Sequence, residues 1–119
     1  MARARIADAV GQAAVAAMPA DRESTATAVR YLLQLLAETA EGNTVEVRVP
    51  PFGAVQAIAG PRHTRGTPPN VVETDAETWI AIATGQQSWG DALAAGRIAA
   101  SGQRGDLSAF LPLDWRSVD

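Results

Sequence analysis

The sequence predicts an α+β domain in which an antiparallel sheet has helices packed on one of its faces. Three observations predict this fold. An amphipathic helical segment near residues 24–41 comes first, two apolar alternating runs follow at 45–49 and 54–58, and residues 71–111 then read as strand, helix, helix, strand and helix. A run of strands beside segregated helices is typical of an α+β layer architecture.

Composition excludes several classes of function. The formal net charge is −3 and all 10 basic residues are arginines, so we expect no attraction to nucleic acid. Cysteine is absent and histidine occurs once, which argues against a metal or other cofactor. No apolar run approaches the roughly 20 residues of a membrane span. We therefore expect a cytoplasmic protein without stable membrane insertion.

The 119 residues fit one domain, which we divide into an N-terminal helical extension at 1–18 and a core at 19–119. In the extension, helical spacing places one set of apolar side chains on a common face, namely Ile6, Val10, Ala13, Ala14 and Ala17. We expect that face to be the buried one.

The main helix of the core carries an apolar stripe at i, i+3, i+4 and i+7 spacing, formed by Val29, Leu32, Leu33, Leu36 and Ala40. Arg30, Gln34 and Glu38 are expected to face outward. The stripe needs an apolar partner, and the strand at 45–49 offers one. Its valines alternate with Glu46 and Arg48, which predicts one buried and one solvated sheet face.

Capping signals mark the boundaries that follow. Thr74 and Glu77 form a T-x-x-E capping box for the next helix, and Gly85 is suited to its left-handed end. Ser88 can cap a second short helix. The alternation from Arg97 to Ser101 predicts a strand.

A last helix is predicted after Asp106, which is suited to cap it. Its apolar face consists of Leu107, Phe110 and Leu111, and Pro112 ends it.

This order of elements resembles the C-terminal half of the sterol carrier protein type 2 family, and is most similar to its small single-domain bacterial members. The residues that carry the resemblance are Asp75, Trp79, Gly85, Ala92 to Ala95, Gly96-Arg97-Ile98, Gly102 and Leu107 to Leu111. The resemblance implies a non-catalytic carrier whose helices and sheet enclose an apolar cavity. It implies a lipid, fatty acid or sterol-like ligand.

Residues for such a cavity come from the helical stripe, the sheet face and the later helices. The expected ligand-binding residues are Leu32, Leu36, Val47, Trp79, Ile82, Phe110 and Leu111. A tryptophan at helical spacing beside Ile and Ala is also typical of a filled core. The residues alone leave both interpretations of Trp79 open.

The segment at 60–70 gathers Arg62, His63 and Arg65 among glycines and prolines. Two guanidiniums and an imidazole suit the acidic head group of a ligand. The alternative is a solvated loop whose arginines pair with surface carboxylates and contribute little energy.

Motifs for catalysis are missing. There is no G-x-S-x-G elbow and no phosphate-binding G-x-x-x-x-G-K-[ST], and lysine does not occur, so we assign no catalytic residue. A rival to the carrier is an interaction module with a filled core and no ligand. It would bind a protein partner or form a homodimer through the 60–70 loop or Trp115.

Overall fold

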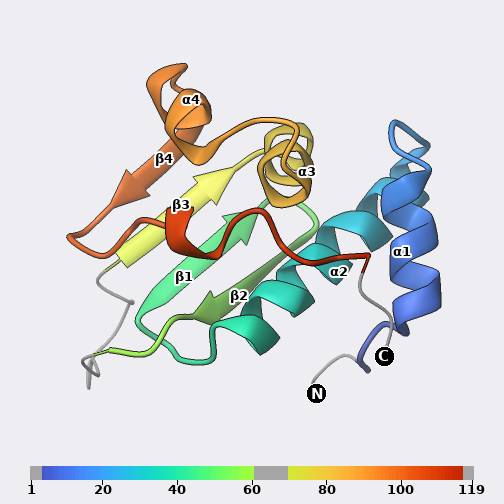
Figure 1. Cartoon of the computed structure of the whole chain (residues 1–119), viewed down its shortest axis with the longest axis horizontal. Coiled ribbons are helices and arrows are strands. Elements are labelled where there is room, and N and C mark those ends of the chain that lie inside the picture. The colour runs from blue at the N-terminus through green and yellow to red at the C-terminus, as the bar shows by residue number, and fades with distance from the viewer. Residues whose placement is uncertain (1–3, 61–69, 117–119) are drawn as a thin grey trace.

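The computed structural model describes residues 4–60 and 70–116, and the following account concerns those residues. Two helices, three strands, two helices and a last strand follow one another along the chain, and the strands form one four-stranded sheet with the strand order β2-β1-β3-β4 (Figure 1). The helices are α1 (Asp8–Ala16), α2 (Arg22–Thr39), α3 (Ala76–Thr84) and α4 (Trp89–Ala94), with a short 3₁₀ turn η1 (Ser108–Phe110). The strands are β1 (Val45–Val49), β2 (Gly53–Ala57), β3 (Asn70–Thr74) and β4 (Ile98–Ser101).

The sheet is mixed, which corrects the expectation of a purely antiparallel one. β1 pairs antiparallel with β2 and β3 with β4, but β1 and β3 are parallel. The reason lies in the path of the chain. Val45 at the start of β1 is opposite both Ala57, the end of β2, and Asn70, the start of β3. The chain therefore leaves β2 and enters β3 at the same end of the sheet, on the other side of β1. The α+β class itself is confirmed.

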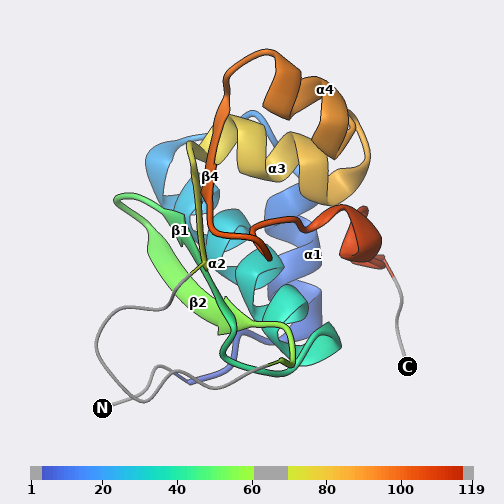
Figure 2. The same cartoon turned by 90° about the vertical axis from the view of Figure 1, so that its left-hand side faces the viewer.

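The main helix and the first strand form the centre of the core as predicted. Val29, Leu32, Leu33, Leu36 and Ala40 are all buried, and so are Val45, Val47 and Val49. α2 packs on β2 and against α3, and α1 packs on α2. Figure 2 shows the strands on one side of the molecule and α1, α2 and α3 together on the other, so the helices cover one face of the sheet.

The face of α1 that packs on α2 differs from the expected one. Gly11 and Val15 are buried, whereas Val10 is 57 % exposed. The ring of Tyr31 explains the difference, because a Cβ at position 11 would overlap it. Only a glycine there lets the two helices approach this closely. The apolar period in this alanine-rich segment was too weak to identify that face.

The cap of α3 is Asp75 and not Thr74. The Asp75 carboxylate accepts a hydrogen bond of 2.7 Å from the amide of Thr78. Thr74 remains the last residue of β3, where its hydroxyl donates to the carbonyl of Arg97 at 2.8 Å. The hydroxyl thus joins β3 to the residue before β4, and the adjacent carboxylate of Asp75 caps the helix. Gly85 and Ser88 do take the expected positions at the end of α3 and the start of α4.

The last helix is shorter than predicted and forms only the 3₁₀ turn η1. Asp106 accepts a hydrogen bond of 2.8 Å from the amide of Ser108, so the expected cap is present. Pro112 lacks an amide hydrogen and follows two residues after η1, which leaves too little chain for a regular helix. Leu107 is wholly buried, while Phe110 and Leu111 are half-buried.

Candidate functional site

Most of the expected ligand-binding residues lie in the packed core. The exposed fraction is 0 % for Leu32, Leu36, Val47 and Trp79 and 1 % for Ile82. The indole Nε1 of Trp79 donates to the carbonyl of Val29 at 3.3 Å, which satisfies its polar atom. Side chains without any accessible surface, as at Leu32, Leu36 and Trp79, contact no water-sized void. In this conformation the interior between α2, α3 and the sheet is therefore closed.

The other expected residues are placed differently. Leu111 lines a pocket of about 340 Å³ together with Ile82 and Trp89, so the structure brings two predicted residues to one opening. Phe110 is half-buried nearby in η1. Arg62, His63 and Arg65 lie outside the described residues.

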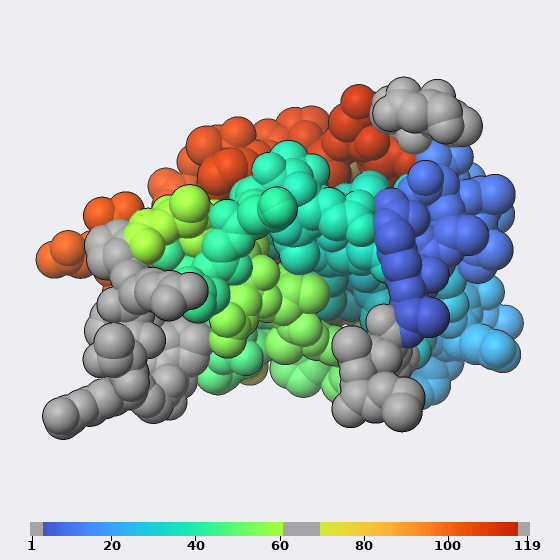
Figure 3. Space-filling view, turned by 90° about the horizontal axis from the view of Figure 1, so that it is seen from below, coloured from blue at the N-terminus to red at the C-terminus, as the bar shows by residue number. Residues whose placement is uncertain are grey.

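A larger hollow lies on the outer side of α2. We call it the hairpin groove, because it runs between α2, the β1–β2 hairpin and the N-terminal residues, and its volume is about 580 Å³. On the face shown in Figure 3 the N-terminal segment lies beside α2, with the strands of the hairpin next to the helix. Its apolar lining includes Ile6, Leu33, Ala37, Phe52 and Val55. Its polar lining consists of Arg5, Arg30, Gln34 and Glu38.

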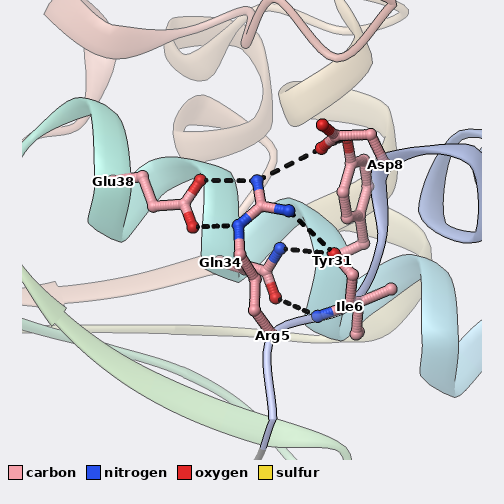
Figure 4. Close-up of polar contacts among 6 residues, drawn as sticks. All are labelled: Arg5, Ile6, Asp8, Tyr31, Gln34 and Glu38. Carbon is pink, nitrogen blue, oxygen red and sulfur yellow. Dashed lines mark hydrogen bonds and ion pairs between the residues drawn. The ribbon is translucent and has the colours of Figure 1, made fainter.

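One wall of the groove is the segment 4–7, which we call the N-terminal strap. Arg5 binds the two carboxylate oxygens of Glu38 through Nε at 2.6 Å and Nη2 at 2.9 Å (Figure 4). The side-chain amide of Gln34 accepts from the backbone N–H of Ile6 at 2.8 Å and donates to its carbonyl at 2.9 Å. Two side chains of α2 thus fix the strap, one by paired charges and one by backbone hydrogen bonds.

The strap is also held where it enters α1. The Asp8 carboxylate accepts hydrogen bonds from the Tyr31 hydroxyl at 2.8 Å and from Arg5 at 3.1 Å (Figure 4). These bonds, first that of Tyr31 and then that of Arg5, hold the pKa of Asp8 below its ordinary value. Burial, together with the bond to Asp8, raises the pKa of Tyr31 above its ordinary value. At neutral pH, Asp8 is therefore an ionised carboxylate that faces the neutral phenol of Tyr31.

The opposite wall is the turn of the β1–β2 hairpin. The guanidinium Nε of Arg30 donates to the carbonyl of Phe52 at 2.8 Å. The guanidinium of Arg22 lies over the ring of Phe52, 5.3 Å from its centre, in a cation–π contact. Two arginines of α2 therefore hold the half-buried Phe52 at the edge of the groove.

The sequence did carry a signal for this groove that the prediction did not use. Arg30, Gln34 and Glu38 recur every four residues, so they form one polar stripe along α2. They were expected to face solvent, but they contact the strap and the hairpin. Phe52 is a second signal, since it is a large apolar residue in a turn with no strand position to bury it.

Another hollow of about 550 Å³ lies between the end of α1 and α3, with Met18, Pro19 and Ile80 in its lining. Within residues 4–60 and 70–116, no three or more His, Cys, Asp or Glu side chains are grouped to hold a metal ion. Over the same residues, no helix combines the length and the apolar character needed to cross a membrane.

Comparison with known families supports the resemblance found in the sequence. A family model described as "Bacterial SCP ortholog" matches residues 21–113, which include every described helix and strand except α1. No match was found among curated proteins. The α+β architecture, with its four-stranded sheet covered by helices on one face, is consistent with this family. The chain therefore belongs to the bacterial family of sterol carrier protein orthologues.

Proposed function

We propose that this protein binds a small apolar or amphipathic ligand, of the lipid, fatty acid or sterol-like class, in the hairpin groove and without catalysis. The observation that carries the proposal is the groove itself. Its volume of about 580 Å³ lies within the range of small-molecule sites. Ile6, Phe52 and Val55 are partly exposed and supply apolar surface, and a few polar side chains surround it. Membership of the sterol carrier family supports the same class of ligand.

The chemistry of the lining supports binding over catalysis. Among the described residues that line the groove there is no serine, threonine, cysteine or histidine that could act as a nucleophile or neutral base. Glu38 is the one carboxylate, and Arg5 occupies both of its oxygens. A carboxylate held in this way is poorly suited to general acid–base work.

The interior lining expected from the sequence is a further part of this proposal. Leu32, Leu36 and Trp79 are core residues here, so a ligand would contact them only after α2 and the sheet separate. The hairpin groove needs no such separation. For that reason it is the proposed first site of binding.

The test is uptake of a defined probe. Purified protein that has been unfolded, stripped of lipid and refolded is incubated with dodecanol, and native mass spectrometry measures the bound fraction. We expect one dodecanol per chain. Ala37→Phe places a ring in the groove and should lower the bound fraction at least fivefold. The matched control is Ala94→Phe, an exposed position of α4, which should bind as the unmodified protein does.

Two outcomes would contradict the proposal. One is that no dodecanol, dodecanoic acid or sterol is retained by the unmodified protein. The other is that Ala37→Phe retains the probe as well as Ala94→Phe does.

A second candidate function is favoured by the closed core. A module with a filled interior would use its surface to bind a protein partner or a second copy. Trp115 is half-buried beside Val15 and Leu113, with the guanidinium of Arg116 4.7 Å from the centre of its ring. Sedimentation velocity should then show a homodimer that Trp115→Ala dissociates. A monomer at all concentrations would remove the homodimer form of this candidate.

A further inference from the structure

Arg30 and Arg22 lie at the hairpin end of the groove. Arg30 lines the groove and donates to the carbonyl of Phe52 through Nε. Arg22 is exposed at the start of α2 and lies over the Phe52 ring. The same residue is therefore contacted by two guanidiniums, one at its ring and one at its backbone carbonyl.

These two arginines differ from Arg5 at the other end. Arg5 is neutralised by Glu38 and Asp8. Within residues 4–60 and 70–116, neither Arg22 nor Arg30 has a carboxylate within ion-pair distance. The hydrogen bond of Arg30 uses Nε, so its Nη1 and Nη2 groups are not engaged by the described side chains. The groove thus has one end where two carboxylates surround one guanidinium, and another end where the guanidinium of Arg30 has no ion-pair partner among the described residues.

We propose that the Arg30 guanidinium is an anion site, to which Arg22 adds positive charge from the far side of Phe52, and that the ligand of the groove is an anionic amphiphile. Its carboxylate or phosphate would accept hydrogen bonds from the Nη groups of Arg30, a geometry for which a planar guanidinium is suited. Its apolar tail would lie along Leu33, Ala37 and Val55. This inference rests on the proposed function, because it names the chemistry of the ligand in the same groove.

A neutral ligand should bind at Arg30 with lower affinity than an anionic one. Arg30 is half-buried, so a neutral head group placed over it would remove water from the guanidinium without supplying a charge. An alcohol oxygen can accept a hydrogen bond from the guanidinium, but it carries no charge, and hydrogen bonds to an ionised acceptor are stronger. Anions are therefore favoured over alcohols of the same chain length.

The experiment compares dodecanoate, dodecyl phosphate and dodecanol by isothermal titration calorimetry at neutral pH, below their micelle concentrations. Acetate and inorganic phosphate serve as head groups without a tail. We expect the unmodified protein to bind at least one of the two anionic amphiphiles about tenfold more tightly than dodecanol. The tail-free anions should bind too weakly to measure.

Three arginine variants test which residue causes the preference for anionic ligands. Arg30→Gln retains a donor for the Phe52 carbonyl and should reduce the anion preference, which is the ratio of anion to dodecanol affinity in the same variant, to about one. Arg22→Gln, at an exposed position, should reduce the preference in part. Arg97→Gln changes the net charge equally, but Arg97 lies between α4 and β4 and pairs with Glu77. It should leave the preference intact.

The outcomes separate this inference from the proposed function. Equal binding of dodecanol and both anionic amphiphiles would overturn the anion site and leave the groove as a carrier of neutral ligands. A preference that survives Arg30→Gln would also overturn it. Binding of no probe would overturn both. Tight binding of tail-free phosphate or acetate would show a site for a free anion instead and would contradict the amphiphile.

Discussion

Gly11 decides how α1 is attached to the rest of the molecule. The backbone of α1 lies directly against the ring of Tyr31, and a Cβ at position 11 would overlap ring atoms. Glycine in a helix usually costs stability relative to alanine, by about 1 kcal/mol. Here that cost is offset because the close approach buries Tyr31 and places its hydroxyl against Asp8. The presence of glycine at position 11 is thus explained by the packing of α1 on Tyr31 and not by helix propensity.

Gly11→Ala should therefore destabilise the protein, against the direction of helix propensity. Overpacking of this kind typically costs roughly 1–3 kcal/mol. We expect a loss of that size in the free energy of unfolding measured with urea. Gly90→Ala in α4 is the matched control, because a Cβ there meets no atom within 4 Å. Gly90→Ala should be neutral or slightly stabilising, and equal effects at the two positions would contradict this account of α1.

At the scale of elements, polar contacts attach the N-terminal strap to α2. The Asp8 carboxylate has a lowered pKa because it accepts hydrogen bonds from Tyr31 and Arg5. A carboxyl with a lowered folded pKa contributes stability above its unfolded pKa, near 3.8. That contribution is lost as the pH falls through the lower folded value. The attachment of the strap should therefore weaken in acid.

Asp8→Asn should lower the free energy of unfolding at pH 7. The difference in free energy of unfolding between this variant and the unmodified protein should narrow as the pH falls below about 3.8, the unfolded pKa, and through the lower pKa of the folded carboxyl. Urea unfolding at a series of pH values measures this difference. Tyr31→Phe removes the hydroxyl donor. In a protein that carries Tyr31→Phe, adding Asp8→Asn should therefore cost less free energy of unfolding at pH 7. A difference between Asp8→Asn and the unmodified protein that stays constant from pH 7 to pH 2.5 would show that Asp8 does not act through its charge.

Elements with strong periodicity were predicted well. The leucine stripe of α2 and the valine alternation of β1 report burial directly, because each period selects one face. The remaining elements depended on features that the sequence pattern does not contain. The buried face of α1 is set by the ring of Tyr31 on α2. Asp75 caps α3 in place of Thr74, because the Thr74 hydroxyl donates to the carbonyl of Arg97.

At the scale of the whole molecule, helices α1, α2 and α3 lie together on one face of the sheet, and α2 is their central member. Its apolar side closes the core, so the residues expected to line a cavity, such as Leu36 and Trp79, fill it instead. Its polar stripe holds the strap and the hairpin, and the groove lies between them. Sequence reasoning identified the apolar side of α2 but could not show that side chains from three elements meet on the polar side.

The central claim is that a ligand enters the hairpin groove while the core stays closed. The most direct measurement is nuclear Overhauser contact between protonated dodecanol and a deuterated protein that carries protonated methyl groups on Leu, Val and Ile. The account predicts contacts to the methyls of Ile6, Leu33 and Val55, and none to Leu32, Leu36 or Ile82. Contacts to the core methyls with none to the groove would contradict it.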